Sequence, residues 1–208
     1  MTDFADFKAQ IADWANRQDW SDALVVSFIR QAEQKFNSDL RVDRMIKTAE
    51  NLVTLRCATL PDDWLEADFV SMENENGPNG FLPIRYKARD EFFNLVDKWS
   101  YGYYTIEGRT MTFGGTPDAI EGVTFRMAYY AEVPVFADDC PSWIYDKYPK
   151  LYLQAALANA DFHAVGEEDK ALMLEQQVDA TIAKLNDLHR RARASGSRLT
   201  RSKVRTFG

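Results

Sequence analysis

The spacing of apolar residues changes twice along the chain, and these two changes constrain its fold more than any other feature. Near the start, apolar side chains recur every three or four positions, as on one face of a helix: Phe4, Phe7, Ile11 and Trp14. From residue 44 to about 135, β-branched and aromatic residues are separated by turn sequences, which is typical of strands. The helical spacing returns after Pro141. This order predicts an α+β fold instead of an alternating parallel sheet.

The helical regions are predicted to form an antiparallel bundle of about four helices. Residues 3–16 and a helix capped by Ser21 are separated by a short turn, so they should form a hairpin. Pro149 suits the first turn of a third helix, which we expect to stop at Gly166. The fourth helix, expected to end at Ser195-Gly196, is marked by a stripe near a 3.5-residue repeat: Leu174, Val178, Thr181, Leu185, Leu188 and Ala192.

The middle of the chain is predicted to be an inserted antiparallel β domain. Gly108-Arg109 suits a tight hairpin, and residues 89–99 are expected to form one short helix. The expected strands are Met45–Ala49, Leu52–Arg56, Ala67–Glu73, Phe81–Tyr86, Tyr103–Glu107, Thr110–Phe113 and Thr124–Tyr130. The chain is thus divided into an N-terminal helical hairpin, a β-rich insertion, C-terminal helices and an extended basic C-terminal arm, at residues 1–43, 44–135, 141–194 and 195–208.

Charge is distributed unevenly between the two ends of the chain. The 208 residues include 32 acidic and 25 basic ones, for a net charge of −7. No acidic residue follows His189, whereas seven basic residues do: Arg190, Arg191, Arg193, Arg198, Arg201, Lys203 and Arg205. The rest of the chain therefore carries 18 basic residues against 32 acidic ones. A basic segment interrupted by serine and glycine is expected to be extended until it meets an acidic or carbonyl-rich surface.

The sequence carries no motif of a common enzyme class. It has no Gly-x-Gly-x-x-Gly run, phosphate-binding loop, His-Glu-x-x-His or Gly-x-Ser-x-Gly sequence. His163 and His189, the only two histidines, are expected near helix ends, where the helix dipole favours a cation. Cys57 and Cys140 have no nearby His or Cys, so we expect free thiols and no structural zinc. These observations predict no enzyme activity, no cofactor and no metal.

Two alternatives stay open at this point. Carboxylate oxygens are hard ligands, so a divalent cation could bind at Asp62-Asp63, Asp138-Asp139 or Glu167–Asp169, although helix caps and solvated loops explain these clusters better. Aromatic residues from Trp99 to Tyr130 could stack on nucleic-acid bases, but the surrounding charges are mixed, which favours a core or a subunit interface. No stretch approaches the ~18 apolar residues of a membrane helix, and the first residues are acidic, so we expect neither membrane insertion nor secretion.

Several sequence segments, in a fixed order, give the chain a resemblance to a known family. They include Phe28-Ile29-Arg30-Gln31-Ala32-Glu33, Asn37-Ser38-Asp39-Leu40-Arg41-Val42, Leu60-Pro61-Asp62-Asp63-Trp64-Leu65-Glu66, Tyr103-Tyr104-Thr105-Ile106-Glu107-Gly108, Tyr129-Tyr130-Ala131-Glu132-Val133-Pro134 and the run from Tyr148 to Leu157. With these segments the chain resembles the tail-adaptor proteins of tailed bacteriophages, also called head-to-tail connector or head-completion proteins. The likeness covers nearly the whole chain.

The resemblance implies a structural virion protein made in the host cytoplasm. Its copies would form a ring, usually of twelve, at the head-tail junction, between the portal protein and the tail nozzle or tail-tube protein. Double-stranded DNA would pass through the ring during packaging and ejection without being bound specifically. In such proteins the C-terminal segment tends to dock on the portal, which implies a docking role here for Arg190, Arg191, Arg193, Arg198, Arg201, Lys203, Arg205 and Phe207.

The residues fit this implied role on physical grounds. A ring through which DNA slides should not hold phosphates, and an acidic body repels them. The planar fork of arginine suits carboxylates and carbonyls on a protein partner, and Phe207 could add an apolar anchor. The alternative function is a nucleic-acid-binding module whose basic tail grips phosphates, and a hydrolase with a carboxylate-bound cation is a third possibility.

Overall fold

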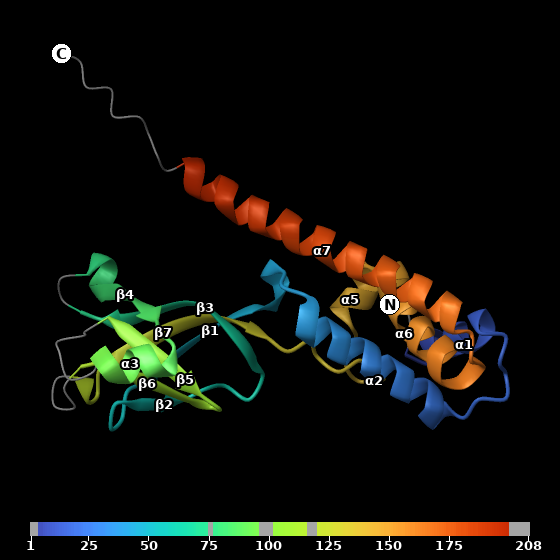
Figure 1. Ribbon diagram of the computed structural model, residues 1–208, viewed down its shortest axis with the longest axis horizontal. Coiled ribbons are helices and arrows are strands. Elements are labelled where there is room, and N and C mark those ends of the chain that lie inside the picture. Colours follow the sequence, from blue (N-terminus) through green and yellow to red (C-terminus); the bar gives the residue numbers. More distant parts are fainter. Residues whose placement is uncertain (1–3, 75–76, 96–101, 116–119, 200–208) are drawn as a thin grey trace, which may run out of the picture. The chain divides into compact units, whose positions relative to one another are not determined.

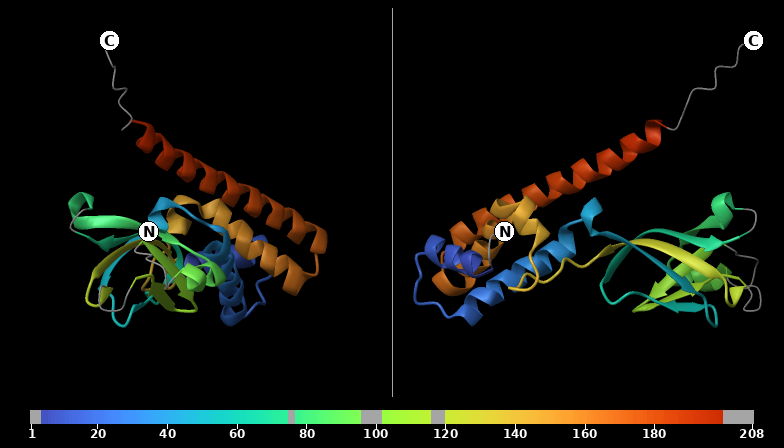
Figure 2. Two further views of the ribbon diagram at one scale, coloured as in Figure 1. Left: turned by 60° about the vertical axis from the view of Figure 1, so that its left-hand side comes forward. Right: turned by 180° about the vertical axis from the view of Figure 1, so that it is seen from behind.

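The chain folds into two compact units, one mainly helical and one mainly of strands (Figures 1 and 2). The computed structural model describes residues 4–74, 77–95, 102–115 and 120–199. As far as they are described, Met1–Asp43 and Val133–Gly208 make up the helical unit, and Arg44–Glu132 make up the strand unit. The chain therefore leaves the helical unit once, completes the strand unit, and returns.

The helices of the helical unit begin and end at residues whose chemistry suits those positions. Ser21 caps the second helix by accepting a hydrogen bond from the Leu24 N–H, and Pro149 opens a later one. Gly166, in the left-handed conformation that glycine adopts readily, ends the segment before the last helix. The elements are α1 (Phe4–Trp14), α2 (Asp22–Asp39), α5 (Trp143–Lys147), α6 (Pro149–Ala160), the π-helical turn η3 (Asp161–Val165) and α7 (Glu168–Leu199).

A cluster of aromatic rings forms the core of the helical unit. Phe7 lies at its centre, with ring centroids 4.6 Å from Tyr145, 5.0 Å from Tyr152 and 5.7 Å from Phe136. All of these side chains are buried. They come from α1, α5, α6 and the segment after the strand unit, so the cluster joins parts of the chain more than a hundred residues apart. Edge-on and tilted ring pairs of this kind add to the stabilisation from apolar burial.

Seven strands make up the sheet of the strand unit, in the spatial order β1-β7-β3-β4-β5-β6-β2. All neighbours are antiparallel except β4 and β5, which run parallel. The two edge strands are β1 and β2, and only residues Val53–Arg56 connect them. The sheet curves until it nearly closes on itself. The strands are β1 (Ile46–Leu52), β2 (Cys57–Thr59), β3 (Trp64–Glu73), β4 (Phe81–Tyr86), β5 (Tyr103–Glu107), β6 (Thr110–Phe113) and β7 (Thr124–Ala131).

The core of the strand unit lies inside this curve. It is apolar, with side chains that alternate along the strands, as in the burial of every second residue of β7. Its largest members include Met72, Tyr104, Met111, Phe113, Phe125, Met127 and Tyr129. Several of the aromatic residues that could have stacked on bases are therefore core residues; Trp99 and Tyr101 lie outside the described residues.

The predicted arrangement, a bundle of about four helices with an inserted antiparallel β domain and an extended basic C-terminal arm, is wrong. The described residues form six α-helices and a sheet of seven strands that includes one parallel pair. The parallel pair requires a crossover, and α3 (Arg89–Leu95) lies in it. Residues 195–199, the described part of the expected arm, continue α7 as a helix. One glycine costs a helix only about 1 kcal/mol, so Gly196 does not end it.

Individual elements were predicted better than their arrangement. The strands β4, β5 and β6 have the predicted bounds, and Gly108-Arg109 forms the hairpin between β5 and β6. The expected strand Leu52–Arg56 is wrong, because Leu55 and Arg56 adopt positive φ angles in a turn closed by the Thr54–Cys57 bridge. The five-residue α5 and three-residue β2 were missed, since neither is long enough to display a period.

Asp63 links three parts of the strand unit and gives its stability a dependence on pH. Its carboxylate accepts hydrogen bonds from Lys47 Nζ at 2.5 Å and Tyr129 Oη at 3.0 Å. Burial raises the pKa of Asp63, but these two donors outweigh it, so the pKa lies below the ordinary 3.8. Burial and the bond to Asp63 raise the pKa of Tyr129 from 10.0 to about 12.

We expect the Asp63→Asn variant to be less stable than wild type near neutral pH, and this difference to shrink in acid and in alkali. A lowered carboxyl pKa gives stability that is present above 3.8 and lost as pH falls further, whereas the raised pKa of Tyr129 gives stability present below 10.0 and lost as pH rises toward about 12. The difference in unfolding free energy between wild type and Asp63→Asn should therefore shrink at both ends. Urea unfolding from pH 2.5 to 11.5 measures it, with the neighbouring, fully exposed Asp62→Asn as control. A difference that is constant with pH would contradict this assignment.

Candidate functional site

The candidate site is the C-terminal half of α7, where the helix continues beyond the residues that pack it. The side chains of α7 that are buried in the helical unit are Ala171, Val178, Ile182 and Leu185. Their spacing of three, four and seven residues places them on one stripe of the helix. Leu188 continues this stripe but is half exposed, and the described side chains from Arg190 to Ala194 are exposed. In Figure 1 the end of α7 runs past the C-terminal end of α2.

Polar contacts hold α7 against the C-terminal end of α2 just before this point. The Asn186 side chain donates to the Asp39 carbonyl at 2.8 Å and accepts from the Arg41 N–H at 2.7 Å. It thereby satisfies one of the carbonyls that the end of α2 leaves without a helical partner. His189, three residues after Asn186, has its Nδ1 3.1 Å from Asp43 Oδ2. The position of α7 is thus fixed by contacts as far as His189.

Lys35 adds an ion-pair bridge to the same packing. Its ammonium lies 2.8 Å from the Asp179 carboxylate on α7 and 2.7 Å from Asp39 on its own helix. Hydrogen bonds to Asp179 and then Asp39 raise the pKa of Lys35 above its ordinary value, and the bond from Lys35 lowers the pKa of Asp39. Each pair is partly exposed, so it contributes orientation more than stability.

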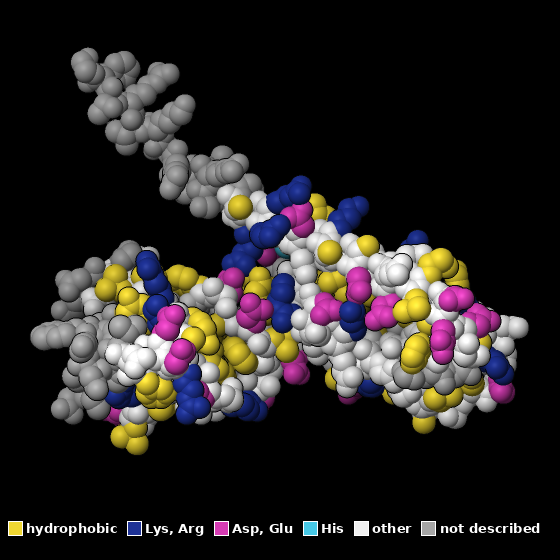
Figure 3. Space-filling model, viewed as in Figure 1, with side chains coloured by type: hydrophobic (Ala, Val, Ile, Leu, Met, Phe, Trp, Pro, Cys, Tyr) yellow, Lys and Arg dark blue, Asp and Glu magenta, His cyan; other side chains and the backbone are white. Residues whose placement is uncertain are grey.

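The exposed end of α7 is basic. Arg190 and Arg191 both bind Asp187, at 2.7 and 2.6 Å, and the hydrogen bond from Arg190 is the main cause of the lowered pKa of Asp187. Their side chains are nevertheless 81% and 76% exposed. A guanidinium carries five N–H donors, so one carboxylate shared between two arginines leaves most of them available to a partner. Figure 3 shows Lys and Arg side chains gathered at this end of the helix.

The predicted docking residues are distributed over described and undescribed parts of the chain. Arg190, Arg191 and Arg193 lie on α7, and the backbone of Arg198 belongs to its last turn. Arg201, Lys203, Arg205 and Phe207 lie outside the described residues. Sequence reasoning overlooked Asp187, although its spacing of three and four residues from two arginines is the usual signal of helical ion pairs.

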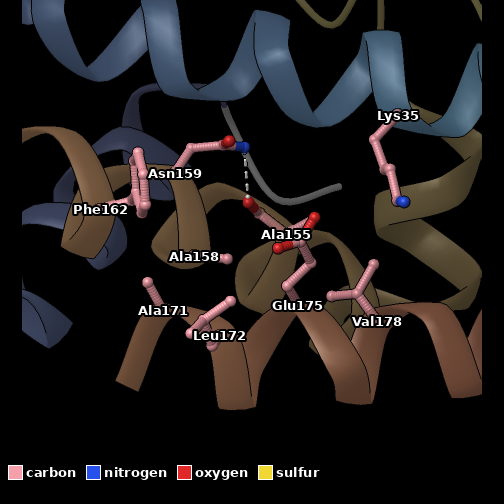
Figure 4. A pocket seen from close by; sticks show the side chains of 9 residues that line it. All are labelled: Lys35, Ala155, Ala158, Asn159, Phe162, Ala171, Leu172, Glu175 and Val178. Atoms are coloured by element: carbon pink, nitrogen blue, oxygen red, sulfur yellow. Dashed lines mark hydrogen bonds between the residues drawn. The ribbon is translucent and has the colours of Figure 1, made fainter. Parts of the chain in front are cut away.

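Two grooves flank α7 nearer its start. The first, of about 250 Å³, is floored by alanines of α6 and α7 and bordered by Phe162 and Leu172, with Glu175 at its lip (Figure 4). The second, of about 390 Å³, lies between α1, α6 and α7 and is lined by Trp14, Leu153, Leu157, Leu174 and Lys150, among others. Both are predominantly apolar, which is the character of a surface that packs against a protein.

Three of the carboxylates considered for metal binding have other partners in the structure. Asp62 and Asp63 pair with Arg109 and Lys47, and Glu167 pairs with Lys170. No group of three or more His, Cys, Asp or Glu that could hold a metal ion occurs among the described residues. Cys57 and Cys140 are free and partly buried, and the side chain of His163 lies outside what the structure describes.

None of the described helices has both the length and the hydropathy for crossing a bilayer.

Comparison with protein-family models gives a match over most of the chain. No curated protein matches the sequence. The family model described as SU10 adaptor protein matches residues 2–202, and this range includes the whole strand unit, most of the helical unit and the whole of α7. A match over so much of the chain confirms the resemblance to phage head-to-tail adaptors that the sequence segments indicated. The chain therefore belongs to the SU10 adaptor protein family, a family of phage structural adaptors.

Proposed function

We propose that copies of this protein form a ring that acts as a structural joint, not as an enzyme, between the portal and the tail of the virion. The observation that carries this proposal is the family match over residues 2–202. A dodecameric ring at the head-tail junction, with the portal on one side and a tail nozzle or tail-tube protein on the other, is the arrangement proposed. The acidic body supports the passage of DNA through such a ring, because it repels phosphates.

The basic end of α7, together with residues 200–208, is proposed as the portal-docking element. Its support is that the helix extends beyond Leu185, the last of its described side chains that is buried, with arginines exposed and no acidic residue after Asp187. The Arg190 and Arg191 side chains are 81% and 76% exposed, so a partner protein can reach their guanidinium groups. Carboxylates and carbonyls are the groups that such arginines bind best.

The full chain mixed with its cognate portal is expected to give a complex whose mass exceeds that of the portal by several copies of the chain. Light scattering at moderate salt measures that mass, with each protein alone as control. A chain that leaves the mass of the portal unchanged at micromolar concentration would overturn the proposal.

The basic end also favours a second candidate function, a nucleic-acid-binding module. Phosphate binding through seven basic residues would give an affinity for DNA that falls steeply as salt rises. We expect weak binding with a shallow salt dependence, since the acidic body opposes it. A fluorescence titration with double-stranded DNA at 50 and 200 mM salt separates the two functions, and tight, salt-sensitive binding would favour the second.

A further inference from the structure

The two grooves beside α7 differ in charge and lie on opposite flanks of the helix. Leu172 and Glu175 fall on one side of the buried stripe of Ala171 and Val178, and Leu174 falls on the other, because successive residues of a helix are rotated by about 100°. Each groove is open at the surface of the helical unit. Two neighbouring copies can therefore occupy the two grooves at the same time.

The first groove combines exposed apolar walls with an acidic lip. The Phe162 and Leu172 side chains are 53% and 51% exposed, although both are apolar. Figure 4 shows Glu175 reaching over the groove from α7, beside Ala155 of α6. Among the described residues Glu175 forms no ion pair, unlike Asp179 one turn later, which binds Lys35. Lys35 also lines this groove, but its ammonium is bound by Asp179 and Asp39. The apolar surface and the Glu175 carboxylate therefore suit a partner that brings apolar side chains and a cation.

The second groove has the complementary character. Trp14, at the end of α1, is 66% exposed, and its neighbours Leu153, Leu157 and Leu174 line the groove. Lys150 lies in the first turn of α6 and has no ion-pair partner among the described residues, whereas Lys170 is held by Asp161 and Glu167. This groove therefore offers an apolar surface with one available cation, which the first groove would attract.

We propose that neighbouring copies of the chain pack through these grooves, with Phe162 and Leu172 of one copy against Trp14 and Leu174 of the next, and Glu175 facing Lys150. This inference rests on the proposed ring and names the surfaces that form it. A contact between two different surfaces is heterologous, so each copy keeps one groove available for a further copy. Repetition of such a contact gives a ring when the rotation between successive copies closes, and an open filament when it does not, whereas contact of a groove with itself would stop at a dimer.

A charge exchange tests the interface. Glu175→Lys and Lys150→Glu should each weaken association between copies about tenfold or more by placing like charges opposite each other, and the double variant should restore it to within about threefold of wild type. The measurement is the mass of the full chain by light scattering over a concentration series, alone and with the portal. Lys184→Glu makes the same charge change on α7 outside both grooves, so it should have little effect on association between copies.

Two substitutions of apolar residues test the same interface without a change of charge. Leu172→Ala should weaken association, whereas Met173→Ala, which truncates an equally exposed side chain on the same helix but outside both grooves, should not. Single charge variants that associate like wild type, or a double variant that fails to recover, would overturn the interface. So would a wild-type chain that does not associate with itself either alone or on the portal.

The failure of this inference is distinguishable from failure of the proposed function. The Glu175→Lys variant should still bind the portal as a single copy, because its basic C-terminal end is unchanged. If the portal binds the chain but the charge exchange has no effect, only the interface is wrong. If the portal does not bind the wild-type chain, the docking proposal is wrong whatever the charge variants do.

Discussion

Cutting the chain after Ala194 is expected to reduce its affinity for the portal by at least about 100-fold. The cut removes Phe207 and four of the seven basic residues that follow His189: Arg198, Arg201, Lys203 and Arg205. A hydrogen bond to a charged group contributes about 1.5–3 kcal/mol, so the loss of two such contacts already corresponds to roughly 3 kcal/mol, or a factor of about 100. Titration of the portal with full-length and shortened chains, followed by calorimetry, measures the change.

The shortened chain should fold as well as the full chain. Among the described side chains of α7, Leu185 is the last that is buried, and the contact between His189 and Asp43 also lies before the cut. An unchanged melting temperature would show that the loss of affinity is not a loss of fold. A matched full-length variant with those four basic residues replaced by Gln separates charge from length. Portal affinity that survives both changes would remove residues 195–208 from the docking element.

The end of α7 illustrates what a sequence pattern can and cannot predict. The stripe from Leu174 to Ala192 correctly predicted a long helix, because its period is set by the helix itself. The pattern does not indicate the residue beyond which other parts of the helical unit no longer bury that apolar stripe. Leu188 is exposed and lies beyond Asn186, which contacts the end of α2, and the position of that end is determined elsewhere in the sequence. Exposure of the arginines follows from the same fact.

The sheet shows a similar limit. Alternation within Phe81–Tyr86 and Tyr103–Glu107 is local, so these strands were predicted with their correct bounds. Their parallel pairing was not predicted, since it depends on how the chain between them crosses from one strand to the other. The two grooves beside α7 were missed for the same reason. Trp14, Lys150 and Leu174 come from three helices, and no spacing within one helix indicates that they share a surface.

Glu33 is another residue whose role no local pattern indicates. It lies within α2 and is only 4% exposed. Its Oε1 accepts hydrogen bonds from the Phe136 N–H at 2.7 Å and the Tyr152 hydroxyl at 2.8 Å, partners more than a hundred residues away. Arg30, one turn before it, lies 2.8 Å from Oε2 and also donates to the Phe136 carbonyl at 3.0 Å. The carboxylate thus ties the segment after the strand unit to α2 and α6.

Replacing Glu33 by Ala is expected to lower the unfolding free energy by roughly 3–5 kcal/mol. The change leaves the Phe136 N–H and the Tyr152 hydroxyl without this acceptor in a buried site, and it leaves Arg30 without its carboxylate. Since a domain is stable by only about 5–15 kcal/mol, this single substitution should bring the helical unit close to unfolding. Urea unfolding followed by circular dichroism measures it, together with the melting temperature.

Two milder variants separate the parts of this network. Tyr152→Phe removes one hydrogen bond and keeps the ring in the aromatic cluster, so it should cost only about 1 kcal/mol. Glu33→Gln keeps an acceptor oxygen for Phe136 and Tyr152 but not the charge that pairs with Arg30, so its cost should lie between those of the other two variants. The expected order is Tyr152→Phe, Glu33→Gln, Glu33→Ala. If both Glu33 variants lose the same unfolding free energy, the charge, and not the shared hydrogen bonds, holds this segment against α2. If all three variants lose little, aromatic packing alone holds it.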